Sequence, residues 1–190
     1  IGGLNVTIPY KHDVAALCDK MSPVAASVGA VNTITVKDGR LIGYNTDVFG
    51  LIYAIRRAGI DLFNKKVVIF GSGGASATAV ITSQHERARE VVVISRSGAD
   101  GYNYETLNRH VDADILINTT PLGMYPSPGV APVKIADFPL CKGAIDLIYN
   151  PIRTAFLMEA ERLSIPRTDG LSMLVAQAVL SHSIFFDKTI

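Results

Sequence analysis

The hydrophobic positions of the chain follow two patterns, which meet near residue 47. Before that point, residues 4–8 alternate between apolar and polar side chains, which is typical of a short strand with one polar face. We expect two further strands at 30–36 and 40–45. They flank Asp38-Gly39, a dipeptide typical of a type I′ hairpin turn.

Three helices are expected beside these strands. The first covers 12–20. The second begins at Pro23, because Ser22 is a favoured capping residue and proline is favoured at the first helical position. The third begins where either Thr46 or Asp47 caps it, and its apolar residues fall on one face.

From residue 67 the apolar positions form continuous runs, which suit strands buried on both faces of a parallel sheet. The expected strands are 67–70, 91–95, 115–118 and 144–148, with helices between the first three and later helices at 153–163 and 171–186. The proline-rich stretch 121–139 is expected to form an ordered surface loop. Right-handed crossovers would place the ends of these strands along one edge, where ligands bind.

Together the patterns predict an α/β protein with two lobes. One lobe is a Rossmann-like, doubly wound parallel sheet over 47–170. The other is a partial α/β domain over 1–46, and the helix within 171–190 is expected to return to it and complete it. A site between the lobes would follow from this arrangement.

Residues 67–78, which read VVIFGSGGASAT, carry the first chemical signal. Four apolar residues lead into Gly71, Gly73 and Gly74, which predicts a strand, a tight turn and the start of a helix. A backbone without side chains can approach a phosphate closely, and a helix N-terminus favours negative charge. We interpret the turn as a dinucleotide cradle. Ser76 replaces the usual glycine or alanine, and an ordinary strand–helix turn is the alternative.

The end of the next strand indicates which dinucleotide is bound. NAD-specific sites usually carry a carboxylate about 20 residues beyond the glycines, but here the strand ends in Ser95-Arg96-Ser97. A guanidinium can bond to a 2′-phosphate that a carboxylate would repel, so NADP is favoured over NAD. The alternative is that Arg96 is a surface residue without a ligand.

Composition narrows the class of protein. The 190 residues are 48% hydrophobic, enough for a sizeable core, and a formal net charge of +1 gives no field that would gather nucleic acid or an anionic membrane. Cys18 and Cys141 lack metal-site or redox spacing and are expected to be reduced thiols in the cytoplasm. The four histidines share no spacing, so no metal site is expected.

Two ionisable residues are placed to do chemistry. Lys11 lies just past the end of a strand and Asp47 at the start of a helix, so both can face one site. Oxidation of an alcohol needs a hydride acceptor, which a nicotinamide supplies, and a base for the hydroxyl proton. The two residues are expected to titrate as a coupled pair, and either could be the base. The alternatives are a solvated surface lysine and an aspartate that only caps a helix.

Six stretches together resemble the shikimate dehydrogenase family, and specifically its shikimate dehydrogenase-like branch. They are Asn5-Val6-Thr7-Ile8-Pro9-Tyr10-Lys11, Gly29-Ala30-Val31-Asn32-Thr33, Gly43-Tyr44-Asn45-Thr46-Asp47, the turn 71–75, Asn118-Thr119-Thr120-Pro121-Leu122-Gly123-Met124, and Gly170-Leu171-Ser172-Met173-Leu174-Val175-Ala176-Gln177.

The resemblance implies an NADP-dependent enzyme of aromatic amino acid biosynthesis that interconverts shikimate and 3-dehydroshikimate. It implies that 1–46 is the substrate domain and 47–170 the NADP domain. Lys11 and Asp47 would be the catalytic pair. The substrate-binding residues would be Asn5, Thr7, Asn32, Tyr149 and Gln177. The cofactor-binding residues would be Gly71, Ser72, Gly73, Gly74, Ala75, Ser95, Arg96, Ser97, Thr119, Leu147, Gly170 and Met173. The partner would be a small shikimate-like molecule, with the chain a monomer or a homodimer.

The chain departs from the family's pattern in two places. The family usually opens with a strand and a serine pair that grips the substrate carboxylate; this chain begins after that point, so we expect a truncated N-terminus. The family's Asn-Arg-Thr at the 2′-phosphate is Ser95-Arg96-Ser97, and a further basic residue is missing from 98–101, so the preference for NADP is expected to be weaker. Two alternatives stay open: a quinate/shikimate dehydrogenase that uses NAD, and a non-catalytic nucleotide-binding module.

Overall fold

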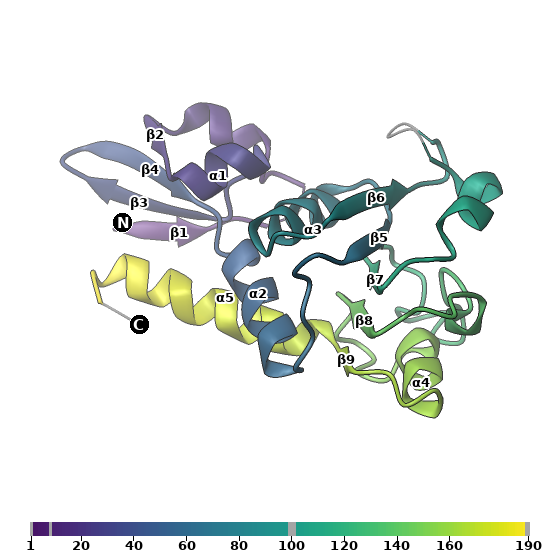
Figure 1. The fold of residues 1–190 in the computed structure, drawn as a ribbon. Coiled ribbons are helices and arrows are strands. Elements are labelled where there is room, and N and C mark those ends of the chain that lie inside the picture. The colour runs from purple at the N-terminus through teal and green to yellow at the C-terminus, as the bar shows by residue number, and fades with distance from the viewer. Residues whose placement is uncertain (1, 8, 99–101, 189–190) are drawn as a thin grey trace.

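Two β-sheets joined by helices form the molecule (Figure 1). The computed structural model describes residues 2–7, 9–98 and 102–188. None of the helices described for these residues is both long and apolar enough to cross a membrane. The architecture is the predicted one, a parallel Rossmann-like sheet and a second, smaller α/β unit.

The smaller sheet contains four strands in the order β1-β3-β4-β2. Their bounds are β1 Gly3–Asn5, β2 Lys20–Met21, β3 Thr33–Lys37 and β4 Arg40–Tyr44. β3 is antiparallel to both β1 and β4, whereas β2 runs parallel to β4. Asp38 and Gly39 have φ angles of 52° and 74°, which a type I′ turn requires, so the predicted hairpin is confirmed.

Two predictions in this region need correction. The helix expected over 12–20 is only a short 3₁₀ helix, η1 (Asp13–Leu17), because Lys20 pairs in β2 with β4 and the chain is already extended at Cys18. Tertiary strand pairing here overrides a helical pattern. The strand expected over 4–8 ends at Asn5, and Ile8 lies outside the described residues. The next helix, α1 (Pro23–Val28), is as predicted.

The larger sheet has five parallel strands in the order β6-β5-β7-β8-β9. They are β5 Lys66–Phe70, β6 Glu90–Ile94, β7 Ile115–Asn118, β8 Gly143–Asp146 and β9 Arg167–Thr168. Every residue of β5, β7 and β8 is buried, which explains their continuous apolar runs. The edge strand β9 was not predicted, because two residues carry no hydrophobic pattern.

Alternating residues of the strands build two cores, one on each side of this sheet. Phe70 and Leu116 pack with Phe156 on one side, and Ile69 and Ile117 pack with Leu51 on the other. The helices and 3₁₀ segments that accompany the sheet are α2 Asp47–Arg57, α3 Gly74–His85, η2 Tyr104–His110, η3 Ile135–Asp137, α4 Ala155–Arg162 and α5 Gly170–Phe185.

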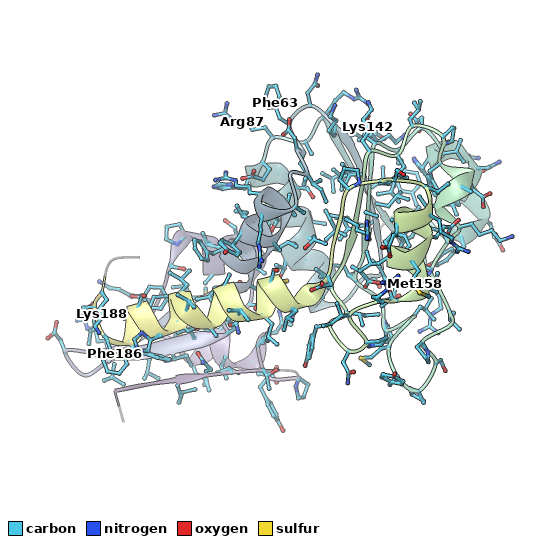
Figure 2. All side chains as sticks on the ribbon, turned by 90° about the horizontal axis from the view of Figure 1, so that it is seen from below. Phe63, Arg87, Lys142, Met158, Phe186 and Lys188 are labelled. Carbon is cyan, nitrogen blue, oxygen red and sulfur yellow. The ribbon has the colours of Figure 1, made fainter. Side chains whose placement is uncertain are left out.

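Helix α5 connects the two sheets. It begins beside the end of β8, packs along α2 and reaches the smaller sheet, where Ser181 bonds to Thr33 of β3. Figure 2 shows this helix from below, with Phe186 and Lys188 at its end by the smaller sheet and Met158 of α4 on the side of the larger one. Helices α2 and α5 therefore fix how the sheets face each other.

Candidate active site

Lys11 and Asp47 meet, although 36 residues separate them in sequence. The Nζ of Lys11 donates to Oδ2 of Asp47 over 2.7 Å, and the side chains keep 25% and 13% of their exposure. Lys11 lies in the turn after β1, where its backbone oxygen accepts from the N–H of Val31 at 2.8 Å. Asp47 is the first residue of α2. The pair is thus partly shielded from water and still open to a small molecule.

Asn32 holds the carboxylate of Asp47 from the other side. Its Nδ2 donates to Oδ1 of Asp47 at 2.9 Å, while its own Oδ1 accepts from the backbone N–H of Thr46 at 2.9 Å. Asn32 is only 4% exposed. One oxygen of Asp47 therefore faces the lysine and the other faces a fixed amide, so the orientation of the carboxylate is set before any ligand binds.

Buried hydroxyl groups tie this pair to α5. The hydroxyl of Thr46 lies 3.2 Å from Oε1 of Gln177 and 3.1 Å from Oγ of Ser181, and Ser181 lies 2.8 Å from the hydroxyl of Thr33. Thr46 occupies the N-cap of α2, but its side chain makes no cap hydrogen bond. Thr46 is therefore the N-cap, one of the two residues expected there, but its hydroxyl bonds within this network and not to the backbone of α2.

Sequence reasoning missed Thr33 and Ser181 and saw Thr46 only as a cap. A signal for Ser181 existed: it follows Gln177 by four residues, which places both on one face of a helix. The signal for Thr33 was weaker, since a threonine in a strand is ordinary.

The next three predicted substrate residues, Asn5, Thr7 and Tyr149, differ in whether hydrogen bonds link them to Lys11 and Asp47. Asn5 joins the network, because its Oδ1 accepts from the Thr33 hydroxyl at 3.2 Å. Thr7 and Tyr149 are exposed, Tyr149 by 50%. Within the part of the chain that the structure describes, neither of these two side chains bonds to Lys11 or Asp47.

The glycine-rich turn lies at the carboxyl end of β5. Gly71 has a φ of 113°, and a Cβ there would lie 2.5 Å from the hydroxyl oxygen of Thr119, which donates to the backbone oxygen of Phe70 at 2.7 Å. Only glycine fits this position. At Gly73, by contrast, a Cβ would have no heavy atom within 4 Å, so this side of the turn is open.

The start of α3 is left free for an anion. Helices α1, α4 and α5 are capped by the side chains of Ser22, Thr154 and Asp169, whereas the N-cap of α3 is Gly73, which has no side chain to cap it. Its first N–H groups can therefore bind a phosphate, and the helix dipole favours the charge. An open glycine turn and uncapped N–H groups fit the pyrophosphate of a dinucleotide.

The other predicted cofactor residues lie along the same sheet edge. Ile94, the last residue of β6, pairs with Phe70, so 95–97 follow the strand beside the glycine-rich turn. Arg96 is exposed there, and Ser95 accepts from the N–H of Gly98 at 3.2 Å. The region expected to lack a further basic residue, 98–101, is described only at Gly98.

The last three predicted cofactor residues, Leu147, Gly170 and Met173, lie around the start of α5. A Cβ on Gly170 would lie 2.1 Å from the backbone oxygen of Leu147, and Met173 packs against the core beside α2.

Asp146 anchors the loop that follows β8. Its carboxylate accepts from the hydroxyl of Thr154 at 2.6 Å and from Asn118 and the N–H of Ile148 at 3.1 Å each. Burial raises the pKa of Asp146 to about 6 in spite of these donors. The loop carrying Leu147 and Tyr149 is thus held at the sheet edge. Among the described residues, no three His, Cys, Asp or Glu side chains gather as a metal site.

The two parts of the site are neighbours. His12, next to Lys11, has its Nε2 at 3.6 Å from the position of a Cβ on Gly74, the first residue of α3. The turn that carries Lys11 and His12 therefore lies close to the glycine-rich turn, although the two turns are about 60 residues apart in sequence.

Known proteins resemble the chain over almost its whole length. A family model described as the shikimate dehydrogenase substrate binding domain matches residues 1–34. The shikimate dehydrogenase (NADP(+)) of Caldicellulosiruptor bescii is 36% identical to this chain over an alignment that covers 97% of this chain and 70% of that protein.

Solved structures agree. A chorismate mutase/shikimate 5-dehydrogenase fusion protein from Clostridium acetobutylicum matches all of this chain and 72% of its own, with a TM-score of 0.93 and 35% identity. The shikimate 5-dehydrogenase of Thermus thermophilus, solved in complex with NADP(H) and shikimate, matches 98% of this chain and 74% of its own, with a TM-score of 0.84 and 33% identity. Identity at this level over so much of both chains shows that the chain belongs to the shikimate dehydrogenase family.

Proposed function

We propose that the chain is an NADP-dependent oxidoreductase that interconverts shikimate and 3-dehydroshikimate. The observation that carries this proposal is the Lys11–Asp47 pair, oriented by Asn32 and lying beside an open glycine-rich turn. A non-catalytic nucleotide-binding module would have no use for such a pair. Relatives named shikimate dehydrogenase (NADP(+)), and the Thermus structure with NADP(H) and shikimate, support the substrate and the cofactor.

In this mechanism the protein handles the proton. The nicotinamide of bound NADP supplies the hydride acceptor or donor. Lys11 and Asp47 take the proton of the reacting hydroxyl when the alcohol is oxidised, and return it to the oxygen when the ketone is reduced. Nζ of Lys11 donates to Oδ2 of Asp47, so both groups are placed to act on the same proton. Asn32 keeps the carboxylate aimed at the lysine.

Uncharged polar side chains suit a polyhydroxylated ring. We propose that Asn5, Thr7, Asn32, Tyr149 and Gln177 bond to the hydroxyl groups of the substrate. Such sites reject analogues that lack a hydroxyl, because a buried polar group is then left unpaired. The proposed substrate domain is 1–46 together with 171–190, since α5 bonds to β3 through Ser181 and Thr33.

The NADP domain is proposed to be 47–170. The phosphates would lie against Gly71, Ser72, Gly73, Gly74 and Ala75, with Arg96, Ser95 and Ser97 at the 2′-phosphate and Thr119, Leu147, Gly170 and Met173 along the rest of the edge. The exposed Arg96 at the end of β6 supports the choice of NADP over NAD. Both cysteines are free thiols, which suits the reducing cytoplasm.

One assay tests the proposal. The absorbance of reduced nicotinamide is followed with shikimate or quinate and with NADP or NAD, giving four combinations. Shikimate with NADP should give the highest kcat/KM. A parallel preparation of Lys11→Ala controls for a contaminating host enzyme. Equal rates with NAD and quinate would replace the proposal with the quinate/shikimate alternative, and no turnover in any combination would favour a nucleotide-binding module.

A further inference from the structure

His12 has a ring that is held in one orientation. Its Nδ1 lies 2.9 Å from the backbone oxygen of Gly29, the residue that ends α1. A carbonyl oxygen can only accept a hydrogen bond, so Nδ1 carries the hydrogen. Nε2 is therefore the nitrogen left for a second partner.

That nitrogen faces the N-terminus of α3. It lies 3.6 Å from the Cβ position of Gly74, the first residue of that helix. Packing between α1 and α3 keeps the two segments together, since Val28 of α1 shares an apolar cluster with Ala77 and Ile81 of α3 (Figure 1). A group bound on the open N–H groups of α3 would therefore have His12 beside it.

We propose that His12 donates a hydrogen bond from Nε2 to the pyrophosphate of the bound dinucleotide. The inference rests on the proposed function, which supplies the dinucleotide. Phosphate oxygens only accept, so in the complex the ring carries a hydrogen on each nitrogen and a positive charge. The α3 backbone binds the pyrophosphate from the larger sheet, and the imidazolium binds it from the smaller one.

This contact would couple the cofactor to the chemistry. His12 follows Lys11 directly, and the two share the turn after β1. A pyrophosphate held by His12 fixes that turn, and with it the ammonium that faces Asp47. Binding of the cofactor then completes the alignment of the acid–base pair.

Binding of two nucleotide fragments tests the proposal without turnover. The dissociation constants of 2′-phospho-ADP-ribose, which contains the pyrophosphate, and of adenosine 2′-monophosphate, which lacks it, are measured by calorimetry. His12→Ala should weaken the first about tenfold, the order expected for one charge-assisted hydrogen bond, and leave the second unchanged. His12→Arg should restore the first.

Three further variants sharpen the test. His12→Gln can still bond to the oxygen of Gly29 through its amide N–H groups but has no charge, so it should show part of this loss even if His12→Ala folds poorly. Arg96→Ala should weaken both fragments, because both carry the 2′-phosphate. His85→Ala is the matched control, since His85 is an exposed histidine at the opposite end of α3.

The outcomes separate the two proposals. Unchanged affinity of His12→Ala and His12→Gln for the pyrophosphate fragment, with tight binding by the wild type, overturns the role of His12 and leaves the proposed function intact. An equal loss for both fragments also overturns it, because the effect is then on the fold. Failure of the wild type to bind either fragment overturns the proposed function and the inference with it.

Discussion

At the scale of single residues, the proposed chemistry depends on the Lys11–Asp47 pair. Lys11→Ala should lower kcat by about two to four orders of magnitude, because one acid–base group is lost, while the dissociation constant of NADP stays within about a factor of two. Steady-state kinetics and a nucleotide titration measure the two effects. Lys20→Ala removes an exposed lysine of β2 as the control. Normal kcat in Lys11→Ala would take the lysine out of the mechanism.

A second residue, the buried His110, leads to a prediction of how the stability of the fold depends on pH. It is buried against the ring of Tyr102, and neither ring nitrogen has a hydrogen-bond partner within the described residues. Burial lowers the pKa of His110, and the charge of Lys66 lowers it further. The folded state then binds fewer protons than the unfolded state below about pH 6.5, so its stability falls as the pH drops through that region.

His110→Phe should remove this fall. One proton bound only by the unfolded state changes the free energy of unfolding by up to about 1.4 kcal/mol per pH unit. Urea unfolding at pH 5.5 and 7.5 should show a larger loss for the wild type than for the variant. The raised pKa of Asp146 has the opposite effect on the pH dependence of stability. Asp146 is present in both proteins, so its effect cancels when they are compared. His85→Phe, at an exposed histidine, should behave as the wild type does; equal pH dependence in His110→Phe would contradict the prediction.

Residues that belong to motifs could be predicted from sequence, and residues that only support them could not. Lys11, Asp47 and Asn32 stand in recognisable stretches, and the structure brings these three together. Their buried partners Thr33 and Ser181 are 148 residues apart, and although the spacing from Gln177 places Ser181 on the same helix face, it does not show which residue Ser181 bonds to. Long-range hydrogen bonds of this kind depend on how elements pack.

At the scale of elements, the crossing of α2 and α5 depends on Gly50. A Cβ there would lie 2.6 Å from the backbone oxygen of Met173 and 3.1 Å from Cβ of Gln177. Gly50→Ala should therefore destabilise the fold by about 1–2 kcal/mol, since overpacking against backbone exceeds the gain of up to about 1 kcal/mol in helix propensity. It should also raise KM for shikimate by displacing Gln177. Urea unfolding and steady-state kinetics measure both.

Gly129→Ala is the control for this change, because no heavy atom lies within 4 Å of its Cβ position. If Gly50→Ala were as stable as the wild type, α2 and α5 could move apart at little cost in free energy. Helix α5 would then not fix the relative position of the two sheets.

Hydrophobic periodicity predicted whether a segment forms a helix or a strand wherever the pattern depended on that segment alone. Four of the five strands of the larger sheet, β5 to β8, and the hairpin at Asp38-Gly39 are found within a few residues of their predicted places. The helix expected over 12–20 failed because pairing of β2 with β4 extends the chain there. A two-residue strand such as β9 exists only through its neighbour, β8, and has no signal of its own.

At the scale of the whole molecule, the two sheets are expected to unfold together. Helices α2 and α5 pack on each other, α2 contributes Leu51 to the core of the larger sheet, and α5 bonds to β3 of the smaller one. Shared packing of this extent favours a single cooperative transition. Far-UV circular dichroism and tyrosine fluorescence should therefore give the same urea midpoint, since the seven tyrosines include Tyr44 of β4 in the smaller sheet and Tyr104 of η2, which packs against the core of the larger sheet.

NADP should raise that common midpoint although its proposed site lies mainly at the larger sheet. At about 100 times its dissociation constant, a ligand that binds only the folded state adds about 2.7 kcal/mol to the free energy of unfolding. With α2 and α5 intact, this gain applies to the whole molecule and both probes shift by the same amount. In Gly50→Ala the link is weaker, so the probes should begin to separate. Two transitions in the wild type, of which NADP moves only one, would show that the sheets are stabilised independently and that α5 does not transmit cofactor binding to the substrate side.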